Sequence, residues 1–364
     1  MPFGEKSMER IYVCHTYYHA YVAFLKEFYL RSMGAKPDAT LVLSRMSCDF
    51  ESFDERVKNT GVFTQVLAFD EQSPEQFPEL EKYKKDTGNF VKNLLQRIKY
   101  TKRLSQLEEP YIPVDFRQYK DIYVFCDSDP IGVYLNRKRI AYHGMEDGLN
   151  CLKNFDAARY DNRGHFGIKV FFSKTLNLIH IQNGWSKYCI DMEVNDIAAI
   201  PNPCPRFVEL PRQSLVARLT PQEKDWILQA FVRDKESLEK MLSDSADTKD
   251  KILILTDPLC TLDIRERIFR DLYEIYSKEG QVFFKPHPRD ILDYRTLFAE
   301  VPQFDATMPM EMLSYFPDVH FKKVIGVLTE MKAIDYADEV VRLGPDFMDA
   351  YEAPEIHRQN EQIY

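Results

Sequence analysis

The sequence predicts an α/β protein with two Rossmann-like, doubly wound domains that face a cleft. Short apolar segments alternate with amphipathic segments of helical period, which is typical of a parallel sheet covered by helices on both faces. The alternation occurs in two series, separated by a stretch at 201–221 that contains five prolines. The length of 364 residues also exceeds the ~100–200 residues of a usual single domain. We therefore expect one domain at 1–210 and another at 211–364, whose last helix packs back on the first.

The first series contains five expected strands. A buried strand at 10–14 is followed by an amphipathic helix that opens at His15 and Thr16, with apolar residues at helical spacing. The other strands are expected at 39–43, 62–69, 121–125 and 139–143, the last ending at Gly144. A long helical segment, basic in its second half, is expected at 75–110.

The second series follows the proline-rich connector, where prolines at this density oppose both helix and central strand. It is expected to contain helices at 222–241 and 263–278. Apolar runs predict strands at 251–255, 282–284 and 323–327.

Charge and cysteine content exclude some classes of protein. The formal net charge of −9 argues against a nucleic-acid partner, because phosphate backbones require clustered excess cations. Seven cysteines occur without a CxxC pair or zinc-ligand spacing, which indicates a reducing compartment and no structural metal. No run approaches the ~20 apolar residues of a membrane span. The sequence thus predicts a cytoplasmic protein, or one held peripherally at the inner face of a membrane.

An acidic motif follows the fifth expected strand, where open α/β sheets place their ligands. Glu146, Asp147 and Gly148 stand after Gly144, and the two glycines permit a tight, exposed loop. A carboxylate in a partly dehydrated cleft suits a general base for a sugar hydroxyl. The alternative is a solvated acidic turn.

A second motif surrounds His287, which stands between Pro286 and Pro288 after an expected strand. Each proline restricts itself and the residue before it, so the imidazole is conformationally fixed. With Lys285 and Arg289 beside it, the ring suits a phosphate, either as a donor or as a proton source for a leaving group. The alternative is a proline-braced turn with an incidental surface histidine.

Two further residues follow in the second half. Glu311 precedes an apolar helix start and is either a favourable charge at that helix end or a carboxylate for ribose hydroxyls. Thr329 follows the strand expected at 323–327 and is either an N-cap or a phosphate ligand at a helix N-terminus.

These motifs together resemble those of the bacterial sialyltransferases. The acidic motif ending in Gly148, followed by His287-Pro288, is similar to their paired acidic-glycine and His-Pro motifs, and 13–16 resembles the first strand and loop of the lipooligosaccharide sialyltransferases of glycosyltransferase family 52. In such families a ribose-binding Glu and a Ser/Thr pair follow the His-Pro motif. Glu311 and Thr329 stand in that order, although Glu330 occupies the place of the second hydroxyl.

The resemblance implies an inverting transferase of the GT-B type, whose donor substrate is CMP-sialic acid and whose acceptor is a glycan of surface lipooligosaccharide or capsule, with no further cofactor. Asp147 would take the acceptor proton, while His287, assisted by Thr329, would stabilise or protonate the departing phosphate. Glu311 would hold the ribose. The flanking Glu146, Gly148, Lys285 and Pro288, together with His15, would bind substrate.

Three other functions remain open. Asp127 and Asp129 match the Asp-x-Asp pattern of metal-dependent transferases, in which carboxylates hold Mn²⁺ or Mg²⁺. In the preferred fold they would instead line the acceptor side of the cleft. The missing second hydroxyl favours a non-catalytic protein that binds a nucleotide sugar, and the same scaffold also admits another nucleotide-linked sugar donor.

The basic stretch at 92–103 and the histidines near the start carry weaker signals. Apolar residues among the cations of that stretch suit a membrane surface or an anionic acceptor, beside the alternative of a solvated face. His15 and His19 are four residues apart, so one helical face presents both, for packing or for lining a cleft. A homodimer is left open.

Overall fold

The computed structural model describes residues 8–125, 127–148, 152, 164–243, 250–316, 319–329, 331 and 334–356. The chain divides into two units, Met1–Glu223 and Lys224–Ile363. The boundary lies inside helix α10 (Pro221–Phe231), later than the predicted boundary at 210. The prediction that the last helix packs back on the first domain concerns a terminus of which 357–364 lie outside the described residues.

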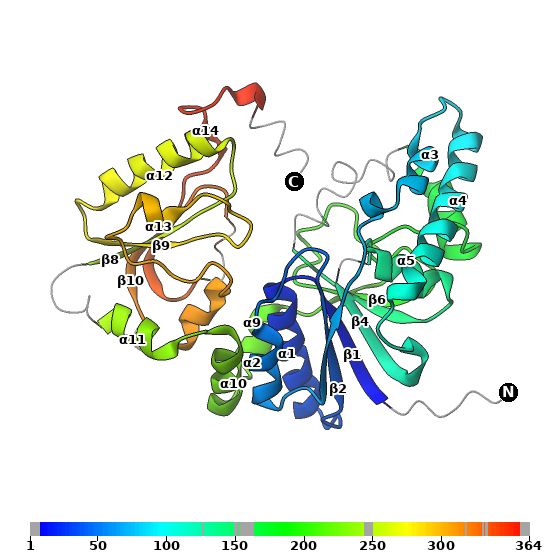
Figure 1. Ribbon diagram of the computed structural model, residues 1–364, viewed down its shortest axis with the longest axis horizontal. Coiled ribbons are helices and arrows are strands. Elements are labelled where there is room, and N and C mark those ends of the chain that lie inside the picture. Colours follow the sequence, from blue (N-terminus) through cyan, green and yellow to red (C-terminus); the bar gives the residue numbers. More distant parts are fainter. Residues whose placement is uncertain are drawn as a thin grey trace. The chain divides into compact units, whose positions relative to one another are not determined.

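The first unit contains a parallel sheet in the order β3-β2-β1-β4-β5-β6-β7, of which Figure 1 labels β2, β1, β4 and β6. Its described strands are β1 (Met8–Cys14), β2 (Ala39–Ser44), β3 (Gln65–Phe69), β4 (Tyr119–Phe125), β5 (Tyr142–Met145), β6 (Cys189–Val194) and β7 (Phe207–Glu209). The central strands β1 and β2 are apolar and almost entirely buried, as expected for a sheet covered on both faces. The strand order reverses between β1 and β4, and such a switch point is where open sheets bind ligands.

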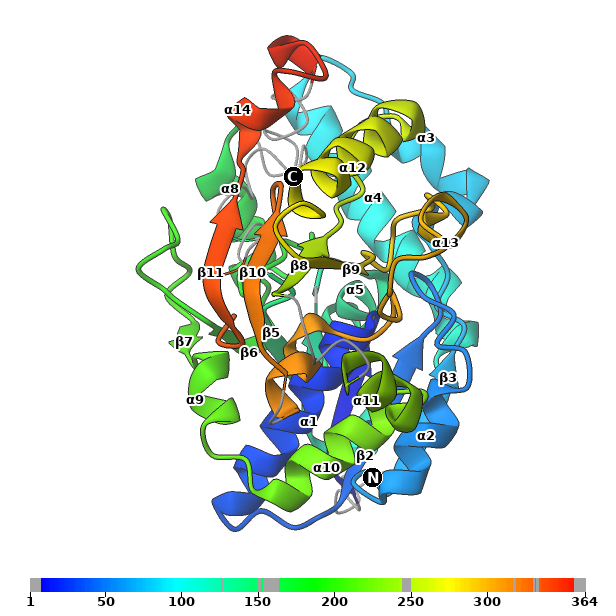
Figure 2. The same ribbon diagram turned by 90° about the vertical axis from the view of Figure 1, so that its left-hand side faces the viewer.

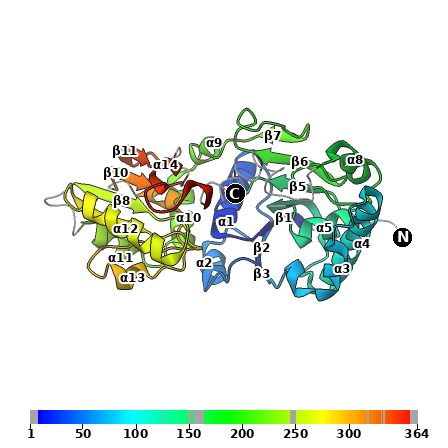
Figure 3. The ribbon, with the colours of Figure 1, turned by 90° about the horizontal axis from the view of Figure 1, so that it is seen from above.

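Helices cover both faces of this sheet. Figure 3 shows α1 (Tyr17–Ser32) and α2 (Phe53–Thr60) on one face and α5 (Pro130–Arg137) on the other, with α4 (Phe90–Glu108) packed against α5. The first unit also contains α3 (Glu81–Lys84), α8 (Phe166–Val170) and α9 (Arg212–Val216). Thr16 caps α1 by accepting the N–H of His19, which fixes where the helix begins after β1.

The second unit contains a parallel sheet in the order β11-β10-β8-β9 (Figure 2). Its strands are β8 (Lys251–Leu255), β9 (Gln281–Lys285), β10 (Phe321–Gly326) and β11 (Ala337–Arg342), and its helices are α11 (Lys235–Ser243), α12 (Leu262–Tyr276), α13 (Tyr294–Leu297), the 3₁₀ helix η7 (Met310–Tyr315) and α14 (Pro345–Met348). From α12, Ile268, Phe269 and Leu272 are buried in the core formed with the strands. Each contributes about 1.5–3 kcal/mol by its burial. Here β8 lies between β9 and β10, so the strand order changes direction at β8.

The elements differ from the sequence predictions at points with local causes. The expected helix at 222–241 is two helices, because Asp234 accepts the N–H of Ser237 and starts a second helix. The segment at 75–110 becomes a long helix only at Phe90, where Asn89 provides the cap. The fifth strand begins at Tyr142 rather than at 139, since Arg139 adopts positive φ, and it runs through Gly144 instead of ending there.

Three described strands have no counterpart in the prediction. β7 is a strand of three residues, flanked by Pro205 and Pro211, at the edge of the first sheet, the place where flanking prolines are tolerated. β6 and the largely exposed edge strand β11 carry too few consecutive apolar residues for a buried-strand pattern. Within the described part of the chain, no helix is both long enough and apolar enough to span a membrane.

Candidate active site

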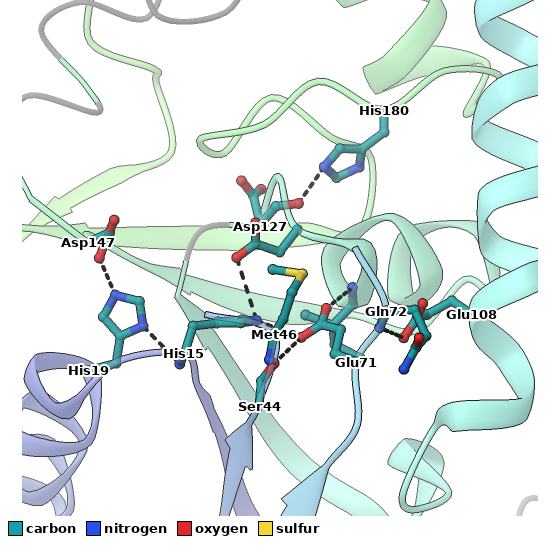
Figure 4. A network of polar contacts seen from close by, with 12 residues as sticks. His15, His19, Ser44, Met46, Glu71, Gln72, Glu108, Asp127, Asp147 and His180 are labelled. Carbon is teal, nitrogen blue, oxygen red and sulfur yellow. Dashed lines mark hydrogen bonds and ion pairs between the residues drawn. The ribbon is translucent and has the colours of Figure 1, made fainter. Parts of the chain in front are cut away.

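The first unit gathers ionisable side chains at the carboxyl ends of its strands (Figure 4). His15 follows β1, Glu71 follows β3, Asp127 and Asp129 follow β4, and Asp147 follows β5. Because parallel strands end at one edge of the sheet, these residues converge around the switch point between β1 and β4. These residues come from segments that are far apart in the sequence.

Asp147 contacts the imidazole of His19, which projects from the first turn of α1. His19 Nδ1 accepts a hydrogen bond from the backbone N–H of His15 at 3.1 Å. The neutral ring therefore carries its proton on Nε2, and this N–H donates a hydrogen bond to Asp147. The ring stacks on Phe125 with centroids 4.3 Å apart. Burial lowers the pKa of His19 against the opposing charge of Asp147, which favours this neutral donor. The carboxylate itself is 32% exposed and therefore accessible to a substrate.

His15 forms a buried ion pair beside this contact. Its Nε2 lies 2.6 Å from a Glu71 oxygen and 3.5 Å from Asp129. Burial opposes the charged ring, but the carboxylates of Glu71 and Asp129 outweigh it and raise the pKa of His15 to about 9. The ring is thus an imidazolium at neutral pH. Its buried Nδ1 has no hydrogen-bond partner among the described residues, and a substrate oxygen is the kind of group that would satisfy it.

Glu71 is itself fixed from other elements of the first unit. It accepts the Ser44 hydroxyl at 2.7 Å and the N–H of Ile131 at 2.8 Å. The nearby Glu108 accepts the N–H of Gln72, and burial together with the charge of Glu71 raises the pKa of Glu108 to about 8. This network is preorganised around one imidazolium, which keeps His15 and Asp129 in place.

Two of the carboxylates predicted to bind substrate accept hydrogen bonds from other parts of the protein. Asp127 is buried and accepts the Tyr142 hydroxyl at 3.0 Å and the N–H of Asn183 at 2.6 Å. Glu146 is buried and accepts the N–H of Asn195 at 2.6 Å, and burial raises the pKa of Glu146. Of the adjacent pair Glu146 and Asp147, only Asp147 is substantially exposed. Gly148 follows it as the last described residue before 149–151.

The second unit presents His287 at the end of β9. Its backbone N–H donates to the Thr256 hydroxyl at 2.9 Å, which ties the His-Pro turn to the end of β8. The ring Nδ1 accepts the N–H of Arg289 at 3.1 Å, so Nε2 carries the proton of the neutral ring. Burial, with the charge of Arg289, lowers the pKa of His287. The ring is therefore arranged as a hydrogen-bond donor through Nε2.

Thr329 lies at the end of β10, beside the same strand β8. Its hydroxyl donates to Asp257 at 2.6 Å, and the same carboxylate accepts the N–H groups of Leu328 and Thr329 at 3.1 and 3.2 Å. Thr329 is thus held by a carboxylate that follows the neighbouring strand β8. Glu330, which the motif comparison singled out, lies outside the described residues.

Lys285 ends β9 next to the His-Pro turn, and Glu311 lies on η7. The buried Lys285 amine donates to the carbonyls of Pro286 and Ala306 at 2.9 and 3.1 Å, and burial lowers the pKa of Lys285 to about 8. Glu311 is half-buried on η7, where burial raises the pKa of Glu311 against the charge of Lys285. Lys285 therefore connects the His-Pro turn to the segment that leads into η7. Pro288 is exposed beside His287.

The sequence motifs pointed to residues in each unit but missed several of their partners. Glu71, Thr256 and Asp257 were assigned no role, although each holds a residue that was singled out. His19 was expected only to pack or to line a cleft, and its contact with Asp147 was not foreseen. Glu71 and Asp257 each stand two residues after the end of a strand, and this position is the signal that could have found them. Strand-end carboxylates are common, so position alone does not select these two.

Comparison with known proteins gives a family and a fold. The model of glycosyltransferase family 52 matches residues 79–341. The structure is similar to an α/β-galactoside α-2,3-sialyltransferase of Photobacterium phosphoreum (12% identity, 91% of this chain and 89% of that chain, TM-score 0.50) and to a sialyltransferase of Photobacterium damsela (12%, 92% and 73%, 0.51). It is also similar to a Photobacterium 2,6-sialyltransferase in complex with CMP and lactose (9%, 92% and 71%, 0.51). A search among curated proteins finds no match. The predicted pair of Rossmann-like domains of the GT-B type is confirmed.

Proposed function

The chain belongs to glycosyltransferase family 52, and from this premise we propose that it is an inverting enzyme that transfers sialic acid from CMP-sialic acid to a glycan acceptor. The acceptor class is a surface lipooligosaccharide or capsule sugar. The fold shared with three solved sialyltransferases supports the donor, and one of those proteins is in complex with CMP. The alternative of a non-catalytic binding protein is not favoured by membership of an enzyme family.

The observation that carries the proposal is the convergence of motif residues at the switch point of the second sheet. Thr256 and Asp257 follow β8, His287 follows β9 and Thr329 follows β10, with hydrogen bonds that join these three segments. Open α/β sheets bind nucleotides at this position. A neutral ring that donates through Nε2 suits a phosphate oxygen.

The acceptor chemistry is assigned to Asp147. Its carboxylate takes the proton of the acceptor hydroxyl while that oxygen forms a bond to the anomeric carbon of the sialic acid. The bond between this carbon and the phosphate oxygen breaks at the same time, and configuration inverts. His19 holds the carboxylate by donating to it from one side, so that the exposed part faces substrate.

The departing CMP carries the negative charge, and His287 is assigned to stabilise it through its Nε2–H. Glu311 is assigned to the ribose hydroxyls. The proposal requires no metal, because the leaving group contains one phosphate and imidazole plus backbone dipoles can offset its charge. Thr329 assists only if a bound phosphate draws its hydroxyl from Asp257.

A donor screen tests the proposal. The purified protein is incubated with CMP-sialic acid, a CMP-linked keto-sugar or a UDP-hexose, with lactose as acceptor, and nucleotide release is measured with and without EDTA. We expect release from CMP-sialic acid alone, undiminished by EDTA. Turnover of a UDP-hexose instead would assign another donor, and loss of activity in EDTA would support the Asp-x-Asp alternative. That alternative is not favoured by the structure, because both oxygens of Asp127 accept internal hydrogen bonds.

Peripheral attachment to a membrane is a second, separate proposal. On α4, the apolar side chains of Val91 and Leu95 are exposed. The exposed Lys92, Lys99 and Lys102 lie at helical spacing from Leu95, on the same face. Apolar and cationic residues on one exposed face suit a surface of anionic lipids. The full chain should cosediment with vesicles that contain anionic lipid at low salt and not with neutral vesicles. Absence of binding to both would contradict the attachment and leave a cytoplasmic enzyme.

A further inference from the structure

The first unit contains a large pocket next to the residues around Asp147. Its volume is about 1190 Å³, above the range of ~300–1000 Å³ typical of small-molecule sites. Its lining residues come from 46–47, from 73–90, from α4, from the segment after β4 and the start of α5, and from 164–182. Asp129 belongs to the lining and lies 3.5 Å from His15, whose N–H binds the ring that holds Asp147. Through Asp129 the pocket is thus connected to the residues that hold the proposed base.

Two side chains of the lining each have a buried polar atom without a hydrogen-bond partner among the described residues. Gln182 is only 5% exposed, and its amide nitrogen has no hydrogen-bond partner among the described residues. The Ser128 hydroxyl is buried and likewise has none within the part of the chain that the structure describes. The neighbouring His180 fixes this segment through bonds of 2.6 Å to the Asp127 carbonyl and 2.9 Å to Ser186. A buried amide without a partner costs about 1–3 kcal/mol, which a ligand hydroxyl would recover.

Aromatic rings complete a lining suited to sugars. Tyr83, Phe90 and Tyr100 are half-buried in the pocket wall, and the Phe90 ring packs against His165 with centroids 4.4 Å apart. Sugars present apolar C–H faces and a rim of hydroxyls, so rings combined with amide, hydroxyl and carboxylate groups recognise both parts. The volume of the pocket suits a saccharide chain rather than one sugar.

The lining carries a small excess of positive charge. Of the five lysines and arginines of α4, only Arg97 belongs to the lining, where it donates to the carbonyl of His180 at 2.9 Å. The pocket lining includes Lys84, Lys85, Arg97 and Lys169. Of the acids in the lining, Asp86 accepts the N–H of Gly88 at 2.8 Å and the amide of Asn93 at 2.6 Å. The lining contains three carboxylates, Glu75, Asp86 and Asp129, against these four cations, and Lys84 is paired with Glu75 and Glu81. This small excess of positive charge favours an anionic group on the saccharide, which the exposed Lys85 would bind by a charge-assisted hydrogen bond.

Building on the proposed function, we propose that this pocket holds the inner sugars of an oligosaccharide acceptor and selects chains that carry a phosphate or a sugar carboxylate. Asp147 acts on the terminal sugar, while the pocket binds the remainder of the chain. The enzyme then recognises its acceptor over several sugars.

The test compares acceptors of different length and charge with CMP-sialic acid as donor. The acceptors are lactose, a neutral tetrasaccharide ending in lactose, and two analogues that carry a phosphate or a carboxylate on the reducing-end sugar. We expect wild-type kcat/KM to be about tenfold higher for an anionic tetrasaccharide than for lactose. The two anionic arms show which group is preferred.

Variants assign the effect to the pocket. Lys85→Gln, an exposed change with little risk to folding, should lower kcat/KM for the anionic tetrasaccharides about two- to fivefold and leave lactose unchanged. Gln182→Leu should raise KM for all tetrasaccharides and not for lactose. Lys92→Gln is the matched control, because Lys92 is exposed on the same helix outside the lining.

Transfer to lactose with no preference for longer or anionic chains would overturn the pocket's role alone, as would equal losses in Lys85→Gln for lactose and the anionic chains. Absence of CMP release with every acceptor would instead overturn the proposed function.

Discussion

Replacing His19 tests how the first unit positions its base. His19→Phe retains a ring that can stack on Phe125 but removes the N–H that contacts Asp147. A hydrogen bond to a charged group contributes about 1.5–3 kcal/mol, so kcat/KM for the acceptor should fall between about tenfold and about 150-fold. KM for CMP-sialic acid should change little, because the donor's nucleotide is assigned to the second unit. The assay is steady-state transfer to lactose at varied acceptor and donor concentrations.

A pH profile and a rescue variant separate positioning from mere packing. The carboxylate loses a bond to its charged form in His19→Phe, so the acidic limb of kcat/KM should move to higher pH. His19→Gln, whose amide can again donate, should recover part of the rate. His320→Phe is a control that breaks another His–Asp contact, of 2.8 Å with Asp338, in the second unit. An unchanged rate and pH profile in His19→Phe would refute the reasoning.

Three further predictions concern other parts of the structure. His287→Ala should lower kcat by about 10²–10³-fold with a smaller change in donor KM, measured by CMP release, and an unaltered kcat would remove His287 from the chemistry. Glu108→Gln should flatten the pH dependence of Tm. The pKa of Glu108 is about 8 in the folded state against 4.5 in the unfolded state. The protonated carboxyl therefore stabilises the folded state fully below pH 4.5, and this contribution disappears as pH rises through 8. Between pH 6 and 9 the wild-type Tm should fall more than that of the variant, and parallel curves would contradict this. Asp127→Asn should lower stability by about 2–3 kcal/mol, or roughly 4–12 °C in Tm by calorimetry, because two buried donors lose a charged acceptor, whereas an undiminished Tm would show that the bonds contribute nothing.

The fold was largely predictable because its central strands are continuous apolar runs bounded by helices of clear period. β1 and β8 are examples, each buried along nearly its whole length. The edge strand β11 was missed for the converse reason, because it is mostly exposed and its sequence contains acidic residues. The break between α10 and α11 depends on the single cap at Asp234, which a periodicity pattern does not register.

The site was predictable in its motifs and not in its contacts. Gly148 and the His-Pro turn mark Asp147 and His287 through short local patterns, whose catalytic roles stay predictions. The pairing of Asp147 with His19 joins residues 128 positions apart and depends on the order of the strands. Asp127 shows the opposite case. It was expected to face substrate, but both of its carboxylate oxygens accept hydrogen bonds from other residues of the first unit.

The most direct test of the central claim is sialic acid transfer by the wild type and by Asp147→Asn, measured side by side as CMP release and product formation from CMP-sialic acid and lactose. The account predicts transfer by the wild type and a loss of about 10²–10⁴-fold in the variant, with CMP binding retained. Transfer by Asp147→Asn at the wild-type rate would contradict the assignment of the base. A wild type that binds CMP-sialic acid and never turns it over would contradict the function itself.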